Sequence, residues 1–137
     1  MVPDARPARA HAIAKVTVES SKSEPIDDGA RPLFEITSTE RFSGDIEGRS
    51  FVRALETERD ERSASLVSLQ RVEGRLGVRE GAFLLRGAER VENGRIKATW
   101  SVVPGSGTGE LSGLRGEGGF RGEFGKSSIA TLTYWFE

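Results

Sequence analysis

Three glutamates are the residues of this chain best suited to acid–base chemistry. Glu40, Glu56 and Glu89 each share one face of an alternating segment with apolar side chains, and such alternation is typical of a strand with one buried face. Carboxyl groups enclosed together in an apolar interior have raised pKa values, through desolvation and mutual repulsion, and can then act as general acid and base. The same pattern also fits glutamates that lie near the mouth of a barrel or pair with arginine.

Further side chains of inward parity could hold a substrate. Gln70 shares the face of Leu66 and Val72, and a buried glutamine must be hydrogen-bonded, so it either closes a polar network or orients a ligand. The other residues predicted to contact a substrate are aromatic: Trp100, Tyr134, Phe34 and Phe83. Because side chains fill the interior of small barrels unless there is room, core packing is the alternative role for Trp100 and Tyr134.

The composition excludes most cofactor chemistry. The 137 residues contain no Cys and a single His, His11, which excludes thiolate nucleophiles, disulfides, iron–sulfur ligation and multi-histidine metal sites. Asp27 and Asp28 are too sparse for a calcium loop. The segment Gly105–Gly119 lacks the lysine and the following helix of a phosphate-binding loop. We therefore expect no metal and no cofactor, and the net charge of −1 argues against a nucleic-acid partner.

The elements that must position these residues are strands. Residues alternate with a period of two, and the expected strands cover residues 12–19, 33–43, 46–58, 63–73, 82–91, 95–103, 120–124 and 129–136. Segments 20–31 and 74–81 are predicted loops, and Asn93-Gly94 predicts a type I′ hairpin turn. Eight short strands without helices between them indicate antiparallel pairing. Glycines inside the strands favour a closed barrel over a sandwich.

The chain is long enough for one domain only. Residues 1–11 predict a flexible N-terminal arm, and residues 12–137 predict the all-β barrel. No apolar run approaches the ~20 residues that a membrane-spanning helix needs, and the N-terminal stretch lacks the apolar segment of a secretory signal. We therefore expect no membrane association and a cytoplasmic location.

Several motifs carry a resemblance to a known family. They are Phe42–Gly48 (FSGDIEG), Leu69–Gly74 (LQRVEG), Gly81–Phe83 (GAF) and the long Gly-rich run Trp100–Phe120. Together they resemble a bacterial family of small proteins labelled as a domain of unknown function, whose members look like the allene oxide cyclase barrel. The resemblance covers residues 12–137 and implies an antiparallel barrel of roughly six to eight strands. It implies no established activity.

Three functions fit these observations. The first is a cofactor-independent cyclase or isomerase that acts on a small apolar molecule in the barrel lumen, with Glu40, Glu56 and Glu89 as proton donors or acceptors. The second is a barrel that binds an apolar ligand without chemistry, and the third is a packed barrel that serves assembly. Trp135 has outward parity among polar neighbours, which indicates a subunit contact in a dimer or trimer.

Overall fold

A computed structural model describes residues 8–26, 29, 31–123 and 125–137. Strands take up 79% of these described residues, which contain no helix, and so no helix able to cross a membrane. The strands are β1 (Ala10–Pro25), β2 (Leu33–Gly44), β3 (Ile46–Asp60), β4 (Ser63–Leu76), β5 (Arg79–Glu92), β6 (Arg95–Val102), β7 (Thr108–Gly109), β8 (Leu114–Glu123) and β9 (Ser128–Phe136).

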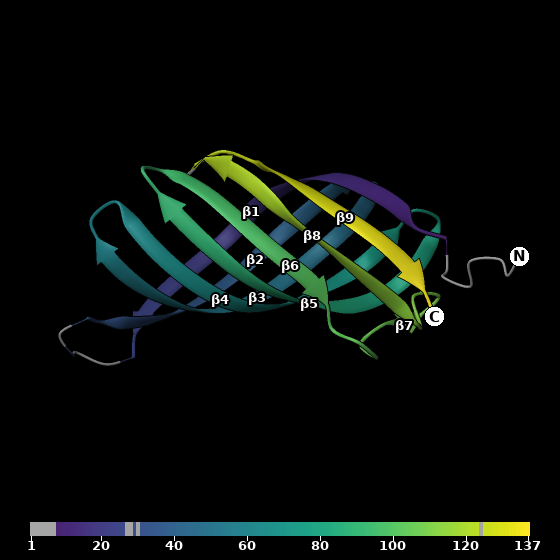
Figure 1. The fold of residues 1–137 in the computed structure, drawn as a ribbon, viewed down its shortest axis with the longest axis horizontal. Coiled ribbons are helices and arrows are strands. Elements are labelled where there is room, and N and C mark those ends of the chain that lie inside the picture. The colour runs from purple at the N-terminus through teal and green to yellow at the C-terminus, as the bar shows by residue number, and fades with distance from the viewer. Residues whose placement is uncertain (1–7, 27–28, 30, 124) are drawn as a thin grey trace, which may run out of the picture.

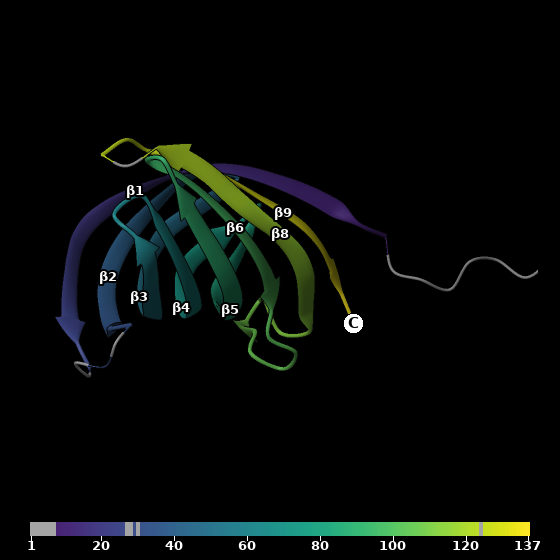
Figure 2. The same cartoon turned by 60° about the vertical axis from the view of Figure 1, so that its left-hand side comes forward.

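The strands close into an antiparallel barrel. The sheet order is β4-β3-β2-β1-β9-β8-β6-β5, and a further pairing of β4 with β5 joins the two ends. The two-residue strand β7 pairs with β5 at Gly81 and Ala82, beyond the end of β6. The eight-stranded closed barrel with one outer strand confirms the predicted fold class. Beyond Val16, strand β1 extends past the end of its pairing with β9 and is paired with β2 alone. The barrel lies lengthwise in Figure 1, and the curvature of β1 to β5 is clear in Figure 2.

Two predicted loops are wrong. Strand β1 continues to Pro25 and pairs with β2 along that length, because backbone pairing across the barrel outweighs the polar composition of the segment. Strand β4 reaches Leu76 and β5 begins at Arg79, so only a two-residue turn separates them. Gly74 marks a close approach of two backbones rather than a loop: a Cβ there would lie 2.0 Å from the carbonyl oxygen of Glu47.

The Gly-rich segment also forms strand earlier than predicted. Strand β8 begins at Leu114, not at residue 120, and it contains four glycines that lie close to the backbone of neighbouring strands. A Cβ on Gly118 would lie 2.0 Å from the carbonyl oxygen of Thr131 in β9. The segment therefore serves tight strand packing.

The hairpin between β5 and β6 has the predicted turn. Asn93 and Gly94 have φ angles of 51° and 79°, the two positive values that a type I′ turn requires.

At the N-terminus, residues 1–7 of the predicted arm lie outside the described residues. Strand β1 begins at Ala10, which pairs with Tyr134.

The apolar core fills one end of the barrel. The core includes Ile46, the first residue of β3, and Leu76, the last residue of β4. It also includes Leu111, from the segment that follows β7. All three side chains are at most 1% exposed. The C-terminus lies at this end, and the turns that join β3 to β4 and β5 to β6 lie at the opposite end (Figure 1). The inward side chains near those turns form the part of the lumen described next.

Candidate functional site

A cavity of about 160 Å3 lies in the lumen between the packed core and the β3–β4 and β5–β6 turns. An engineered apolar cavity of about 150 Å3 in another protein holds benzene, so this space suits a molecule of that size. The wall is apolar except for acids, serines and one glutamine. The lining residues are Ser21, Ile36, Ser38, Glu40, Val52, Ala54, Glu56, Leu66, Gln70, Glu89, Val91, Ile96 and Phe120.

Glu40 is held in a network across three strands. Antiparallel register places it beside Ser50 on β3 and places Val52, two residues further along, beside Gln70 on β4. The Gln70 side-chain amide donates a 2.7 Å hydrogen bond to Glu40 Oε1 and a second, short one to Ser50 Oγ. Gln70 and Ser50 are both buried. Gln70 thus closes a polar network at the boundary between core and cavity, as a buried glutamine must.

Burial raises the pKa of the Glu40 carboxyl from 4.5 to about 7. The cause is desolvation of the ionised form, which the hydrogen bond from Gln70 partly offsets and the negative charge of Glu89 increases. A carboxyl with a pKa near 7 can both accept and return a proton at neutral pH.

Glu89 is the second carboxyl inside the cavity, and the residue is half-buried. Ser68 Oγ donates a 2.5 Å hydrogen bond to Glu89 Oε1, whereas the buried Oε2 has no hydrogen-bond partner among the described residues. Burial raises the pKa of this carboxyl, and the Ser68 hydrogen bond partly offsets the rise. Gly87 provides the room for this pair, because a Cβ there would lie 3.0 Å from Ser68 Oγ and 3.1 Å from Glu89 Oε1.

Glu56 stands at the mouth of the cavity. It is less buried than the other two glutamates, and its pKa is raised by desolvation and by the neighbouring Glu58. Glu56 and Val91 line the inner cavity and also a wider hollow of about 650 Å3 at the strand turns. The three predicted acids therefore share one cavity, with Glu40 and Glu89 inside and Glu56 at its entrance.

The four predicted aromatic contacts do not line the cavity. Trp100 is buried in the core, donates its indole N–H to the carbonyl oxygen of Thr131 at 3.1 Å, and packs 5.3 Å from the ring of Phe120. Phe120 is the aromatic residue that faces the cavity. Phe83 lies in the core, and Tyr134 packs edge-on against Phe136 beside that core. Phe34 is half-buried near the start of β2.

A family model described as a protein of unknown function, DUF3224, matches residues 10–134. The chain belongs to the DUF3224 family. A DUF3224 protein of unknown function from Shewanella oneidensis MR-1, known from its crystal structure, has a TM-score of 0.76 to this chain at 27% sequence identity. The alignment covers 95% of this chain and 98% of that one. No curated protein matches.

The predicted resemblance to a family of unknown function is thereby confirmed. The further likeness to the allene oxide cyclase barrel stays a prediction.

Sequence reasoning missed the serines that complete the site in this DUF3224 protein. Ser50 accepts a hydrogen bond from Gln70, and Ser68 donates one to Glu89. Ser38 donates a 3.0 Å hydrogen bond to Ser21 in the cavity wall. The only signal was their inward parity, which is weak because serine is common on both faces of a strand. Ser21 had no such signal, since it falls in a segment predicted as a loop.

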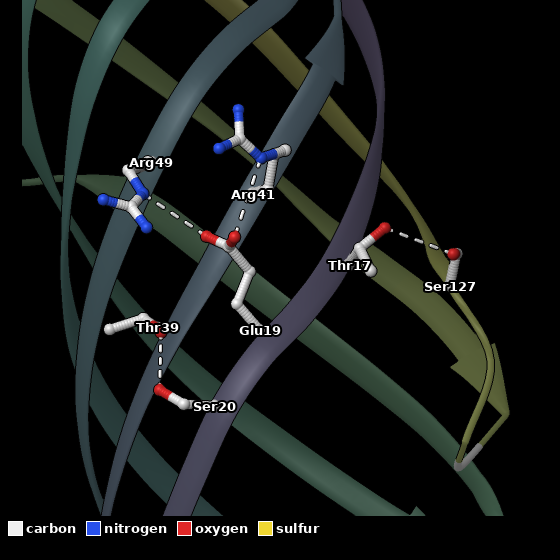
Figure 3. A network of polar contacts seen from close by, with 7 residues as sticks. All are labelled: Thr17, Glu19, Ser20, Thr39, Arg41, Arg49 and Ser127. Carbon is white, nitrogen blue, oxygen red and sulfur yellow. Dashed lines mark hydrogen bonds and ion pairs between the residues drawn. The ribbon is translucent and has the colours of Figure 1, made fainter.

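A β-bulge turns Ser21 into the lumen. The pairing of β1 with β2 shifts register between Val18 and Ser20, which reverses the facing of the residues that follow. On the outside, the Glu19 carboxylate lies between Arg41 and Arg49, at 3.8 and 3.4 Å (Figure 3). Ser20 and Thr39 are hydrogen-bonded at 2.6 Å in the same view. These outward contacts hold residues 19 and 20 on the surface, so that Ser21 faces inward.

The outer wall of this DUF3224 barrel carries a separate apolar groove. It measures about 1020 Å3 and includes the exposed side chains of Leu55, Val67 and Leu69. Trp135 lies elsewhere, half-buried on β9, with the Arg9 guanidinium 4.5 Å from its ring centroid. The predicted homo-oligomer through Trp135 stays a prediction.

Proposed function

We propose that the lumen binds a small, largely apolar molecule and moves a proton on it, as a cofactor-independent isomerase or cyclase does. The observation that carries the proposal is the pair of partly buried carboxyl groups, Glu40 and Glu89, facing one apolar cavity. Isomerisation by proton transfer needs a base that removes a proton from one atom and an acid that returns one to another, with no net gain or loss.

The two carboxyl groups suit different parts of that task. Glu40 is fixed by Gln70 and has a pKa of about 7, so its ionised form is available as the base near neutral pH. Glu89 offers Oε2, to which none of the described residues donates a hydrogen bond, as a site for a polar group of the substrate, and Glu40, once protonated, returns the proton as the acid. The apolar wall, which includes Leu66, Ile96 and Phe120, would keep water from the reacting atoms.

The test uses 3-cyclohexenone, a probe small enough for the cavity, whose conversion to 2-cyclohexenone is a proton transfer between two carbons. We expect the full-length protein to accelerate this conversion, with a rate that rises with pH through about 7 as Glu40 ionises. Glu40→Gln should abolish the acceleration while binding of the probe, followed by NMR, persists. Glu117→Gln, an exposed acid on β8, is the matched control and should behave as wild type.

Binding without catalysis is the second candidate. It is favoured by the small size of the cavity and by the hydrogen bond from Gln70 that already occupies Glu40 Oε1. Saturable probe binding without acceleration, or equal rates in wild type and Glu40→Gln, would overturn the proton-transfer proposal in favour of this one. The absence of any probe binding would overturn both and leave the assembly function.

A further inference from the structure

The ionisable side chains that line the cavity are all acidic. Among the described residues that line it, three are ionisable, Glu40, Glu56 and Glu89, and none is a lysine, arginine or histidine. Two of the three are largely buried, so solvent screens their charge weakly. A carboxylate ligand placed in this space would meet like charges and find no cationic partner, which costs binding free energy.

The hollow outside the cavity is also lined mainly by negatively charged side chains. The outer hollow that shares Glu56 with the cavity is also lined by Glu58, Asp60 and Glu61, and Arg62 is the one basic residue among its lining residues. Clefts lined by charges of one sign concentrate ligands of the opposite sign and repel those of the same sign. The entrance therefore favours cations over anions before a ligand reaches the lumen.

The cavity also offers an acceptor that lacks a donor. Glu89 Oε2 is buried, and none of the described residues donates a hydrogen bond to it. Its partner oxygen, Oε1, is already bound by Ser68. A buried acceptor without a donor costs free energy in the empty protein, and a ligand that brings an N–H group would remove that cost.

We infer that the ligand of this cavity is a small apolar molecule that carries a protonated amine, with the ammonium group on Glu89 Oε2 and the apolar body against the wall around Phe120. This inference rests on the proposed function, because it specifies the substrate class of the same lumen. An ammonium group supplies both the missing donors and the opposite charge, whereas the cavity volume limits the body to about the size of a benzene ring.

The experiment compares three ligands of nearly the same shape: benzylamine, toluene and benzoate. Each is titrated into the full-length protein at pH 8 and followed by the backbone NMR signals of Leu66, Ile96 and Phe120, which line the cavity. We expect benzylamine to bind at least tenfold more tightly than toluene, and benzoate not to bind. Glu89→Gln should remove the tenfold preference for benzylamine and leave toluene binding unchanged. Glu117→Gln should change neither.

The outcomes separate this inference from the proposed function. Toluene or benzoate binding as tightly as benzylamine would overturn the cation preference while the lumen remained a ligand site. An unchanged preference in Glu89→Gln would overturn the role of Oε2. If magnesium or calcium ions displaced benzylamine at the same signals, the occupant would be a metal ion and not an organic cation. No binding of any of the three ligands would overturn the proposed function itself.

Discussion

The side-chain amide of Gln70 on β4 donates a hydrogen bond of 2.7 Å to the carboxyl of Glu40 on β2, across the intervening strand β3. This contact lies where the packed core ends and the cavity begins. It keeps the Glu40 carboxyl in a place that desolvates it, and it is one of the contacts that set the pKa of that carboxyl. The first two predictions follow from it.

Replacing Glu40 by glutamine should stabilise the protein above neutral pH. The folded state raises the pKa of Glu40 from 4.5 to about 7, so folding favours the protonated carboxyl, and that stabilisation is lost as pH rises from 4.5 through 7. A glutamine at position 40 stays neutral at every pH and can still accept the hydrogen bond from Gln70. Glu40→Gln should exceed wild type by about 3 kcal/mol in the free energy of unfolding at pH 8 and by little at pH 4. Urea unfolding at both pH values measures the difference, and a pH-independent difference would contradict the prediction.

Removing the amide of Gln70 should raise the pKa of Glu40 further. The hydrogen bond from Gln70 lowers this pKa against the effect of burial, so Gln70→Leu should move it above its value of about 7. The carboxyl carbon of Glu40, followed by NMR during a pH titration, reports the change. Ser38→Ala is the control, because Ser38 is bonded to Ser21 and not to Glu40. A lower pKa in Gln70→Leu would show that the amide does not stabilise the ionised form.

A methyl group at Gly87 should break the hydrogen bond between Ser68 and Glu89. Its Cβ would lie 3.0 Å from the Ser68 hydroxyl and 3.1 Å from Glu89 Oε1, so one of the two side chains must move. We expect Gly87→Ala to cost about 1–2 kcal/mol of stability and to raise the pKa of Glu89, which this hydrogen bond lowers. In a Ser68→Ala background the cost should be smaller, because the bond is already absent. Equal costs in the two backgrounds would show that the bond is not what Gly87 protects.

The predicted oligomer can be tested at Trp135. Trp135→Asp would place a charge in an apolar contact, which is costly without a partner, and we expect it to reduce an oligomer to the monomer mass in light scattering. Leu55→Asp is the matched apolar-to-acid control in the outer groove and should leave the mass unchanged. A wild-type monomer, or dissociation by Leu55→Asp alone, would contradict the role of Trp135.

The local sequence pattern was sufficient to predict which face of the strand the glutamates occupy. It was not sufficient to predict which residues they contact. Alternation correctly placed Glu40, Glu89 and Gln70 on the inner face, because side-chain direction in a strand follows from position alone. It did not indicate that Gln70 contacts Glu40, since the two are 30 residues apart and their contact depends on the register of β3 with both neighbours. Ser21 was out of reach, because the bulge at residue 19 reverses the parity that a sequence pattern assumes.

The sequence by itself determined the fold class, since period-two alternation, the Asn93-Gly94 turn and glycines within strands are all local signals of an antiparallel barrel. Only the tertiary structure decided how far the core fills the lumen. Trp100 and Phe83 share the inward parity of Glu89, yet they are packed in the core while Glu89 faces the cavity. The physical reason is that closure and register set which inward side chains meet across the barrel, and those contacts join residues far apart in the chain.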